Sequence, residues 1–60
     1  MKLTDFQIGE YFYARLDKKG KPTRFLKTER GCVVIESSHF DRGEVLDISQ
    51  DEECWLMVAY

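Results

Sequence analysis

The chain has 60 residues, of which 43% are hydrophobic, 13% aromatic and 33% charged, and its formal net charge is −2. This length excludes more than one domain, so we expect a single domain over residues 1–60 whose core depends on its aromatic side chains. No segment approaches the roughly 18 apolar residues of a membrane span and no secretory signal is present, which predicts a cytoplasmic chain without a membrane partner.

The small net charge hides an uneven distribution along the chain. Residues 15–30 hold seven Lys and Arg against two acidic residues, a local charge of +5, whereas residues 31–60 hold one Arg against seven acidic residues, a local charge of −6. Two oppositely charged surfaces are therefore expected if the halves fold onto different faces.

Apolar and polar residues alternate in five short stretches that are separated by turn-forming residues, and this pattern predicts strands. The predicted strands are residues 10–16, 23–28, 32–36, 44–48 and 54–60. The turns between them include Asp17–Pro22 and Glu29–Gly31, where glycine supplies a positive φ. Residues 49–53 are predicted to form an acidic turn, and a single helical turn is the alternative because Ser49 and Glu52 fit a capping box. Five strands at this spacing predict an all-β, antiparallel barrel or sandwich.

Strand alternation assigns side chains to two faces. The inward set expected for the first strand is Phe12, Ala14 and Leu16, with Ile8 in the same phase. The opposite face of that strand carries Tyr11, Tyr13 and Arg15. The central strand is apolar on both faces, which predicts a strand covered on two sides by a curled sheet.

The last predicted strand leaves two alternatives open. Either Trp55 and Met57 point inward, or Cys54 and Leu56 do so and Trp55 and Met57 form an exposed apolar patch. An exposed patch of that kind would mark a partner site or a homodimer interface, so both a monomer and a homodimer are expected outcomes.

Neither a metal site nor a catalytic centre is predicted. Cys32, Cys54 and His39 are the soft ligands, and they lack the paired cysteine spacing of structural zinc sites, even with Asp41 as a fourth ligand. The two cysteines are expected to be reduced and buried, because a disulfide framework normally accompanies secretion. The acidic run 51–53 is expected to be a solvated turn, and no cofactor is expected.

Three segments resemble a group of very short bacterial and bacteriophage proteins. Phe6–Phe12 is similar to that group's opening "dLkiGdyF", Arg24–Thr28 to its "vyiKt" strand, and Arg42–Ile48 to its "tGelvdf" strand. The chain departs from the group in its apolar Cys-Val-Val-Ile strand and in its apolar final residues. The resemblance implies an SH3-like five-stranded barrel of largely unassigned function, often encoded by phages, and it transfers no catalytic residues.

These patterns predict a non-enzymatic module that binds an unidentified protein, a host protein if the chain is phage-derived. Tyr and Arg are enriched at interface hot spots. The residues expected to bind the partner are Tyr11, Tyr13, Arg15, Arg24 and Trp55. The alternative is weak nucleic-acid binding through Tyr11, Tyr13, Lys19, Lys21 and Arg24, which the negative net charge disfavours.

Overall fold

The computed structural model describes residues 1–16 and 21–56. They form one antiparallel sheet of five strands in the order β4-β3-β2-β1-β5. The elements are a 3-10 turn η1 (Leu3–Asp5) and the strands β1 (Tyr11–Ala14), β2 (Thr23–Thr28), β3 (Gly31–Glu36), β4 (Val45–Leu46) and β5 (Cys54–Trp55). The predicted all-β class with five antiparallel strands is confirmed. Within the described residues the sheet is open, because β4 pairs with β3 and β5 pairs with β1.

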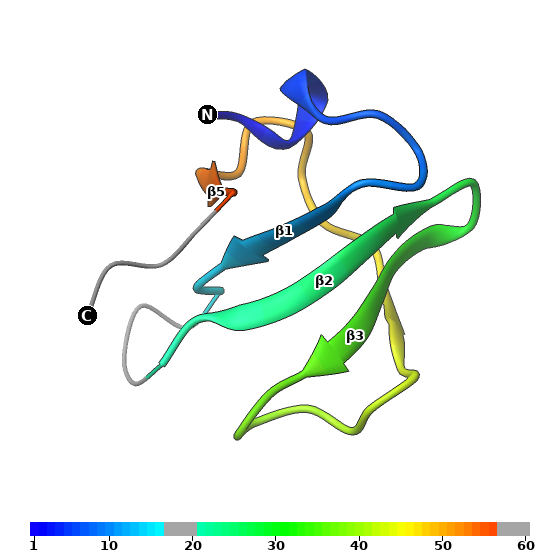
Figure 1. Cartoon of the computed structure of the whole chain (residues 1–60), viewed down its shortest axis with the longest axis vertical. Helices are drawn as coiled ribbons and strands as arrows, with labels where there is room; N and C mark the ends of the chain where they lie inside the picture. Colours follow the sequence, from blue (N-terminus) through cyan, green and yellow to red (C-terminus); the bar gives the residue numbers. More distant parts are fainter. Residues whose placement is uncertain (17–20, 57–60) are drawn as a thin grey trace.

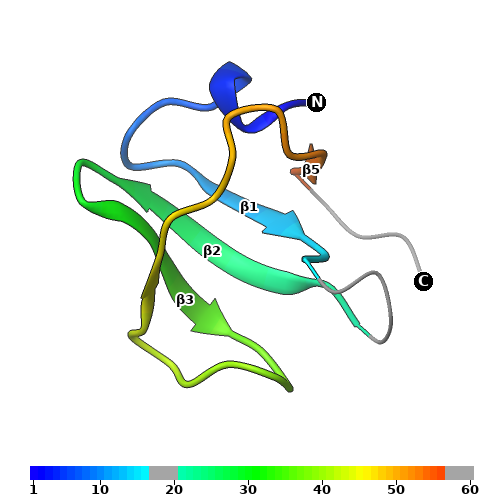
Figure 2. The same ribbon diagram turned by 180° about the vertical axis from the view of Figure 1, so that it is seen from behind.

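One face of the sheet is covered and the other is not. Seen from behind, the segment 47–53 between β4 and β5 crosses the sheet (Figure 2). In Figure 1 the opposite face is turned to the viewer, and no segment within the described ranges crosses it. The buried residues of the covered side are Leu3, Phe6, Phe12, Ala14, Phe25, Cys32, Val34, Ile48 and Cys54. The core therefore lies between the sheet, the η1 turn and segment 47–53.

Three phenylalanines form the centre of this core. The Phe12 ring lies 5.3 Å from the Phe6 ring and 5.4 Å from the Phe25 ring, measured between centroids. Phe12 and Phe25 are completely buried, and they are register partners on β1 and β2. Through Phe6, which follows η1, this pair connects the β1–β2 hairpin to the segment that covers it.

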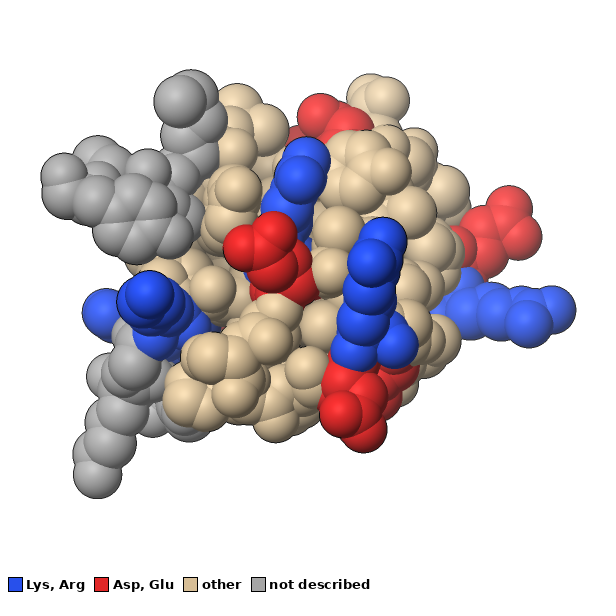
Figure 3. Space-filling model, turned by 60° about the horizontal axis from the view of Figure 1, so that its bottom comes forward, with Lys and Arg blue, Asp and Glu red and all other residues tan. Residues whose placement is uncertain are grey.

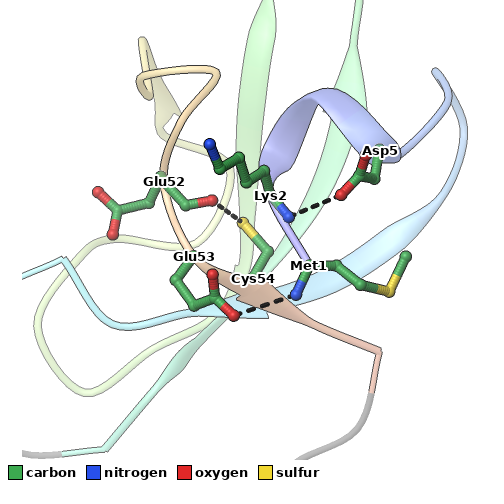
Figure 4. A network of polar contacts seen from close by, with 6 residues as sticks. All are labelled: Met1, Lys2, Asp5, Glu52, Glu53 and Cys54. Atoms are coloured by element: carbon green, nitrogen blue, oxygen red, sulfur yellow. Dashed lines mark hydrogen bonds and ion pairs between the residues drawn. The ribbon is translucent and has the colours of Figure 1, made fainter.

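The first residues of the chain are held against β5 (Figure 4). The Leu3 amide donates to the Glu52 carbonyl at 3.0 Å, and the Cys54 amide donates to the Met1 carbonyl at 2.6 Å. The α-ammonium group of Met1 pairs with Glu53 Oε1 at 3.1 Å. Backbone pairing between segments about 50 residues apart thereby fixes η1 over the core.

Lys27 is part of this construction, although it belongs to the basic stretch of the sequence. Its Nζ donates to the carbonyl oxygens of Leu3 at 3.1 Å and Phe6 at 2.6 Å. These carbonyls flank the end of η1, so the ammonium group ties the turn to the covered face of β2. The positive charge of Lys27 is consequently directed toward the protein and away from any partner on the other face.

Two predictions about the first half of the chain are wrong. The first strand is shorter than residues 10–16, and Ile8, expected inside, is 60% exposed. Gly9 adopts a φ of +95° within a turn closed by the Glu10 amide and the Gln7 carbonyl. This turn interrupts the alternation, so the phase of Phe12 does not extend back to Ile8. The predicted turn over 17–22 lies largely outside the described residues.

The second half shows similar differences. Val33 and Ile35 on β3 are only partly buried, so β3 is not covered on both sides as predicted. β4 and β5 contain two residues each, shorter than the predicted 44–48 and 54–60, although residues 57–60 lie outside the described part. Ser49 closes a turn in which its hydroxyl accepts the Asp51 amide at 3.2 Å, and no helical turn forms there.

The two cysteines are buried free thiols, as predicted. Cys54 is completely buried in β5, and its Sγ lies 3.4 Å from the Glu52 carbonyl oxygen, to which it donates. Burial, aided by the nearby Glu52 charge, raises the pKa of Cys54 from 9.0 to about 11. Burial likewise raises the pKa of Cys32.

The raised pKa of Cys54 predicts a loss of stability in alkaline solution. The folded state holds the thiol proton more tightly than the unfolded state, so this stabilisation is complete below pH 9 and is lost as the pH rises through about 11. In that window one such group changes the free energy of unfolding by up to ~1.4 kcal/mol per pH unit. Urea titrations between pH 8 and 11 should show a shallower decline for Cys54→Ala than for the wild type. Equal slopes would contradict the assignment.

Candidate binding face of the sheet

The uncovered face of the sheet, called here the outer face, carries Tyr11, Tyr13, Arg24, Leu26, Val33, Val45 and Trp55. The strand register arranges these side chains in two rows. Tyr13 is the partner of both Arg24 and Trp55, and Tyr11, Leu26, Val33 and Val45 follow one another across β1, β2, β3 and β4. Aromatic, aliphatic and basic side chains are therefore neighbours on one pleated surface.

Four of the five predicted partner-binding residues lie on this outer face. Tyr11 is 47% exposed and Trp55 37% exposed, while Tyr13 and Arg24 are partly buried. Arg15 is exposed and follows the end of β1. The structure brings Tyr11, Tyr13, Arg24 and Trp55 together on one face. The shared face of Tyr11 and Tyr13 agrees with the strand alternation, whereas the sequence left the face of Trp55 open.

The structure shows which of the two predicted arrangements holds for Cys54 and Trp55, the two residues of β5. Cys54 is completely buried, so Trp55 faces outward. The second arrangement also places Leu56 inside, but Leu56 is 56% exposed, so this part of the prediction is wrong. Met57 lies outside the described residues. Trp55 thus contributes to the outer face at its β5 edge.

An aromatic ring holds the Arg24 side chain in position. Its guanidinium carbon lies 4.7 Å from the centre of the Tyr11 ring, a cation–π contact that orients the side chain. Its Nε is buried and has no hydrogen-bond partner, and no ion pair to Arg24 is found within residues 1–16 and 21–56. A desolvated and unpaired donor of this kind is unfavourable in the folded protein.

A basic pocket of about 300 Å³ opens beside Arg24. Its lining includes Tyr13, Lys21, Pro22 and Glu36. Glu36 reaches the outer face because of a β-bulge: Phe25 pairs with Val34 but Arg24 pairs with Glu36, which leaves one extra residue on β3. Strict alternation would place Glu36 on the covered side with Val34, so sequence patterning could not find this member of the pocket.

An apolar groove of about 480 Å³ lies at the other end of β2. Its lining residues are Ile8, Thr28, Glu29, Arg30, Val33 and Val45. Val33 and Val45 are cross-strand partners, and Val45 is 50% exposed. Sequence analysis missed this groove because Ile8 was assigned to the core.

On one face of the molecule, the charged side chains do not follow the division of the sequence into basic and acidic halves. The face shown in Figure 3 carries basic and acidic side chains close together between broad uncharged areas. The register gives the reason, because β2 of the basic half pairs with β3 of the acidic half and sets Arg24 opposite Glu36. The expected pair of oppositely charged surfaces is therefore not formed on this face.

Other kinds of site have little support within the described residues. There, no group of three or more His, Cys, Asp or Glu side chains is arranged to hold a metal ion. Among the same residues, no helix has the length and apolarity to cross a membrane. Lys19, which belongs to the predicted nucleic-acid surface, lies outside the described residues, whereas Lys21 is exposed and lines the basic pocket.

Comparisons with known proteins give no relative from which a function could be transferred: no family model, curated protein or solved structure matches the chain. The fold and the site define a small all-β domain with one covered sheet face and one face that exposes aromatic, aliphatic and basic side chains.

Proposed function

We propose that this chain is a non-enzymatic, SH3-like binding module that recognises another protein through the outer face. The SH3-like assignment is supported by the antiparallel succession from β1 to β4, with β5 returning to pair with β1. An open sheet that curls over its own core is compatible with such a barrel.

The observation that carries the proposal is the position of Arg24 among exposed aromatic side chains. Tyr, Trp and Arg are the residues most enriched at protein-binding hot spots, where fixed aromatic rings supply contact area and arginine orients a polar group. Here Arg24 stacks on Tyr11, and Tyr13 pairs with Arg24 and Trp55 in the register. The Tyr11 ring already orients the Arg24 side chain, so the ordering of this side chain costs little on binding.

Selection from a library of random linear peptides tests this proposal directly. Peptides enriched on the immobilised protein should bind wild type and lose about tenfold or more in affinity to Tyr13→Ala, which corresponds to a loss of at least ~1.4 kcal/mol. Gln50→Ala is the matched control, because Gln50 is exposed on the segment that covers the opposite face. Its affinity should stay within twofold of wild type, and thermal unfolding should show both variants folded.

Two results would overturn the proposal. The first is a selection that enriches no peptide, or only peptides that bind Tyr13→Ala as well as wild type. The second is binding of single-stranded DNA with an affinity that falls steeply with salt, together with no peptide binding, because counterion release is characteristic of phosphate contacts.

A further inference from the structure

We infer that the ligand of the outer face is an extended peptide that carries a carboxylate side chain and, four residues away, an aliphatic side chain. This inference rests on the proposed protein-binding function and adds the chemistry of the partner. The carboxylate binds in the basic pocket and the aliphatic side chain in the apolar groove, so the peptide lies along β2.

The charges of the basic pocket select a single carboxylate. Lys21 and Arg24 supply two cations and Glu36 supplies one carboxylate, which leaves one positive charge to be balanced. The Tyr11 ring aligns the Arg24 guanidinium, and the buried Nε of Arg24 lacks an acceptor among the described residues. Planar guanidinium groups bind carboxylates through paired, charge-assisted hydrogen bonds. Glu36 at the same time repels a second anionic group, which disfavours a run of phosphates.

The spacing follows from the geometry of β2. Arg24 lines the basic pocket and Thr28 lines the apolar groove. They are four residues apart on one strand, a separation of about 13 Å at a rise of about 3.3 Å per residue. Both point to the outer face, with Leu26 between them.

An extended peptide matches this spacing. Its residues i, i+2 and i+4 point to the same side, and the first and last are also about 13 Å apart. A carboxylate at i therefore reaches the basic pocket, the side chain at i+2 lies over Tyr11 and Leu26, and an aliphatic side chain at i+4 enters the groove beside Val33 and Val45. A helical peptide of the same length spans only about 6 Å between i and i+4, so it cannot reach both pockets with these residues.

Synthetic peptides test the inference independently of any selection. The first is a nine-residue, threonine-rich peptide with aspartate at its third position and leucine at its seventh. In the second, lysine replaces aspartate, and in the third the leucine is moved to the sixth position. Binding is followed by amide chemical shifts of the isotope-labelled protein and by the fluorescence of Trp55.

The aspartate peptide should bind at least tenfold more tightly than the other two. It should shift the amide signals of Arg24, Leu26 and Val33. Arg24→Gln should weaken it by about tenfold or more, whereas Arg42→Gln, which removes an exposed arginine from the loop before β4, should leave its affinity within twofold. Val45→Thr should weaken the aspartate peptide and leave the fold intact, because Val45 is half exposed.

The outcomes separate this inference from the proposed function. If library peptides depend on Tyr13 but the aspartate and lysine peptides bind equally, or Arg24→Gln has no effect, the outer face stands and the ligand chemistry is overturned. The amide signals of the outer face could instead shift when the protein is concentrated without peptide, together with a doubled mass in sedimentation. That result would show that the outer face binds a second copy of the chain, and it would overturn the peptide inference. Failure of both the library and the synthetic peptides would remove the proposed function itself.

Discussion

Replacing Phe12 with alanine should leave most of the chain unfolded at 25 °C. Phe12 is completely buried and contacts both Phe6 and Phe25, so its removal opens a cavity at the junction of the sheet and the η1 segment. Phenylalanine-to-alanine changes in cores cost about 3–5 kcal/mol. A domain of 60 residues has a total stability of only roughly 3–9 kcal/mol.

Circular dichroism and urea titration measure this effect. Phe12→Leu keeps most of the volume and should lose only part of the stability, which keeps the comparison quantitative if Phe12→Ala is fully unfolded. Ile8→Ala is the matched control, because the 60% exposed Ile8 should change the free energy of unfolding by less than about 0.5 kcal/mol. A Phe12→Ala protein with the urea midpoint of the wild type would show that the core does not centre on this ring.

Gly31→Ala should have the second-largest effect, because it combines backbone strain with a steric clash. Gly31 has a φ of +131°, and a Cβ atom there would lie 2.9 Å from the Leu46 carbonyl oxygen and 3.2 Å from Val45 Cγ1. Strain at such a φ costs on the order of 1–3 kcal/mol. The added methyl group would also push β4 away from β3, and β4 contains only two residues.

Gly43→Ala separates the two contributions. Gly43 has a φ of +89°, but a Cβ atom there meets no atom within 4 Å, so this variant should show the strain alone. Urea titration of both variants gives the difference in free energy of unfolding. Hydrogen exchange at the Val34 amide, which donates to the Glu44 carbonyl at 2.8 Å, reports whether β4 has moved. Equal losses in the two variants would contradict the steric part of the argument.

Strand alternation predicted the centre of the sheet well. The inward assignment of Phe12 and Ala14 and the outward assignment of Tyr11 and Tyr13 are both correct, because regular strands impose a period of two. Strand alternation also places Lys27 inward, because Lys27 shares a strand face with Phe25. We did not predict the inward direction of Lys27 because a lysine side chain normally points to solvent. Here backbone carbonyl oxygens accept hydrogen bonds from its ammonium group.

The alternation failed where the backbone departs from a regular strand. The positive φ of Gly9 reverses the phase before β1, and the bulge on β3 turns Glu36 to the outer face. Nothing in the sequence around Glu36 marks that bulge. The basic pocket and the apolar groove could not be predicted for this reason, because each combines residues from three strands and the adjoining loops, and strand register brings them together.

The contact of the first residues with β5 has a consequence for the route by which the chain folds. The β1–β2 and β2–β3 hairpins require only short loops, whereas the pairing of Lys2 with Glu53 must join positions 51 residues apart. Closing a long loop costs more chain entropy than closing a short one. We therefore expect the three-stranded meander to assemble early and the two ends of the chain to meet late. In that order the β1–β3 part of the outer face forms first, and Val45 and Trp55 join it only when β4 and β5 pair and segment 47–53 covers the core.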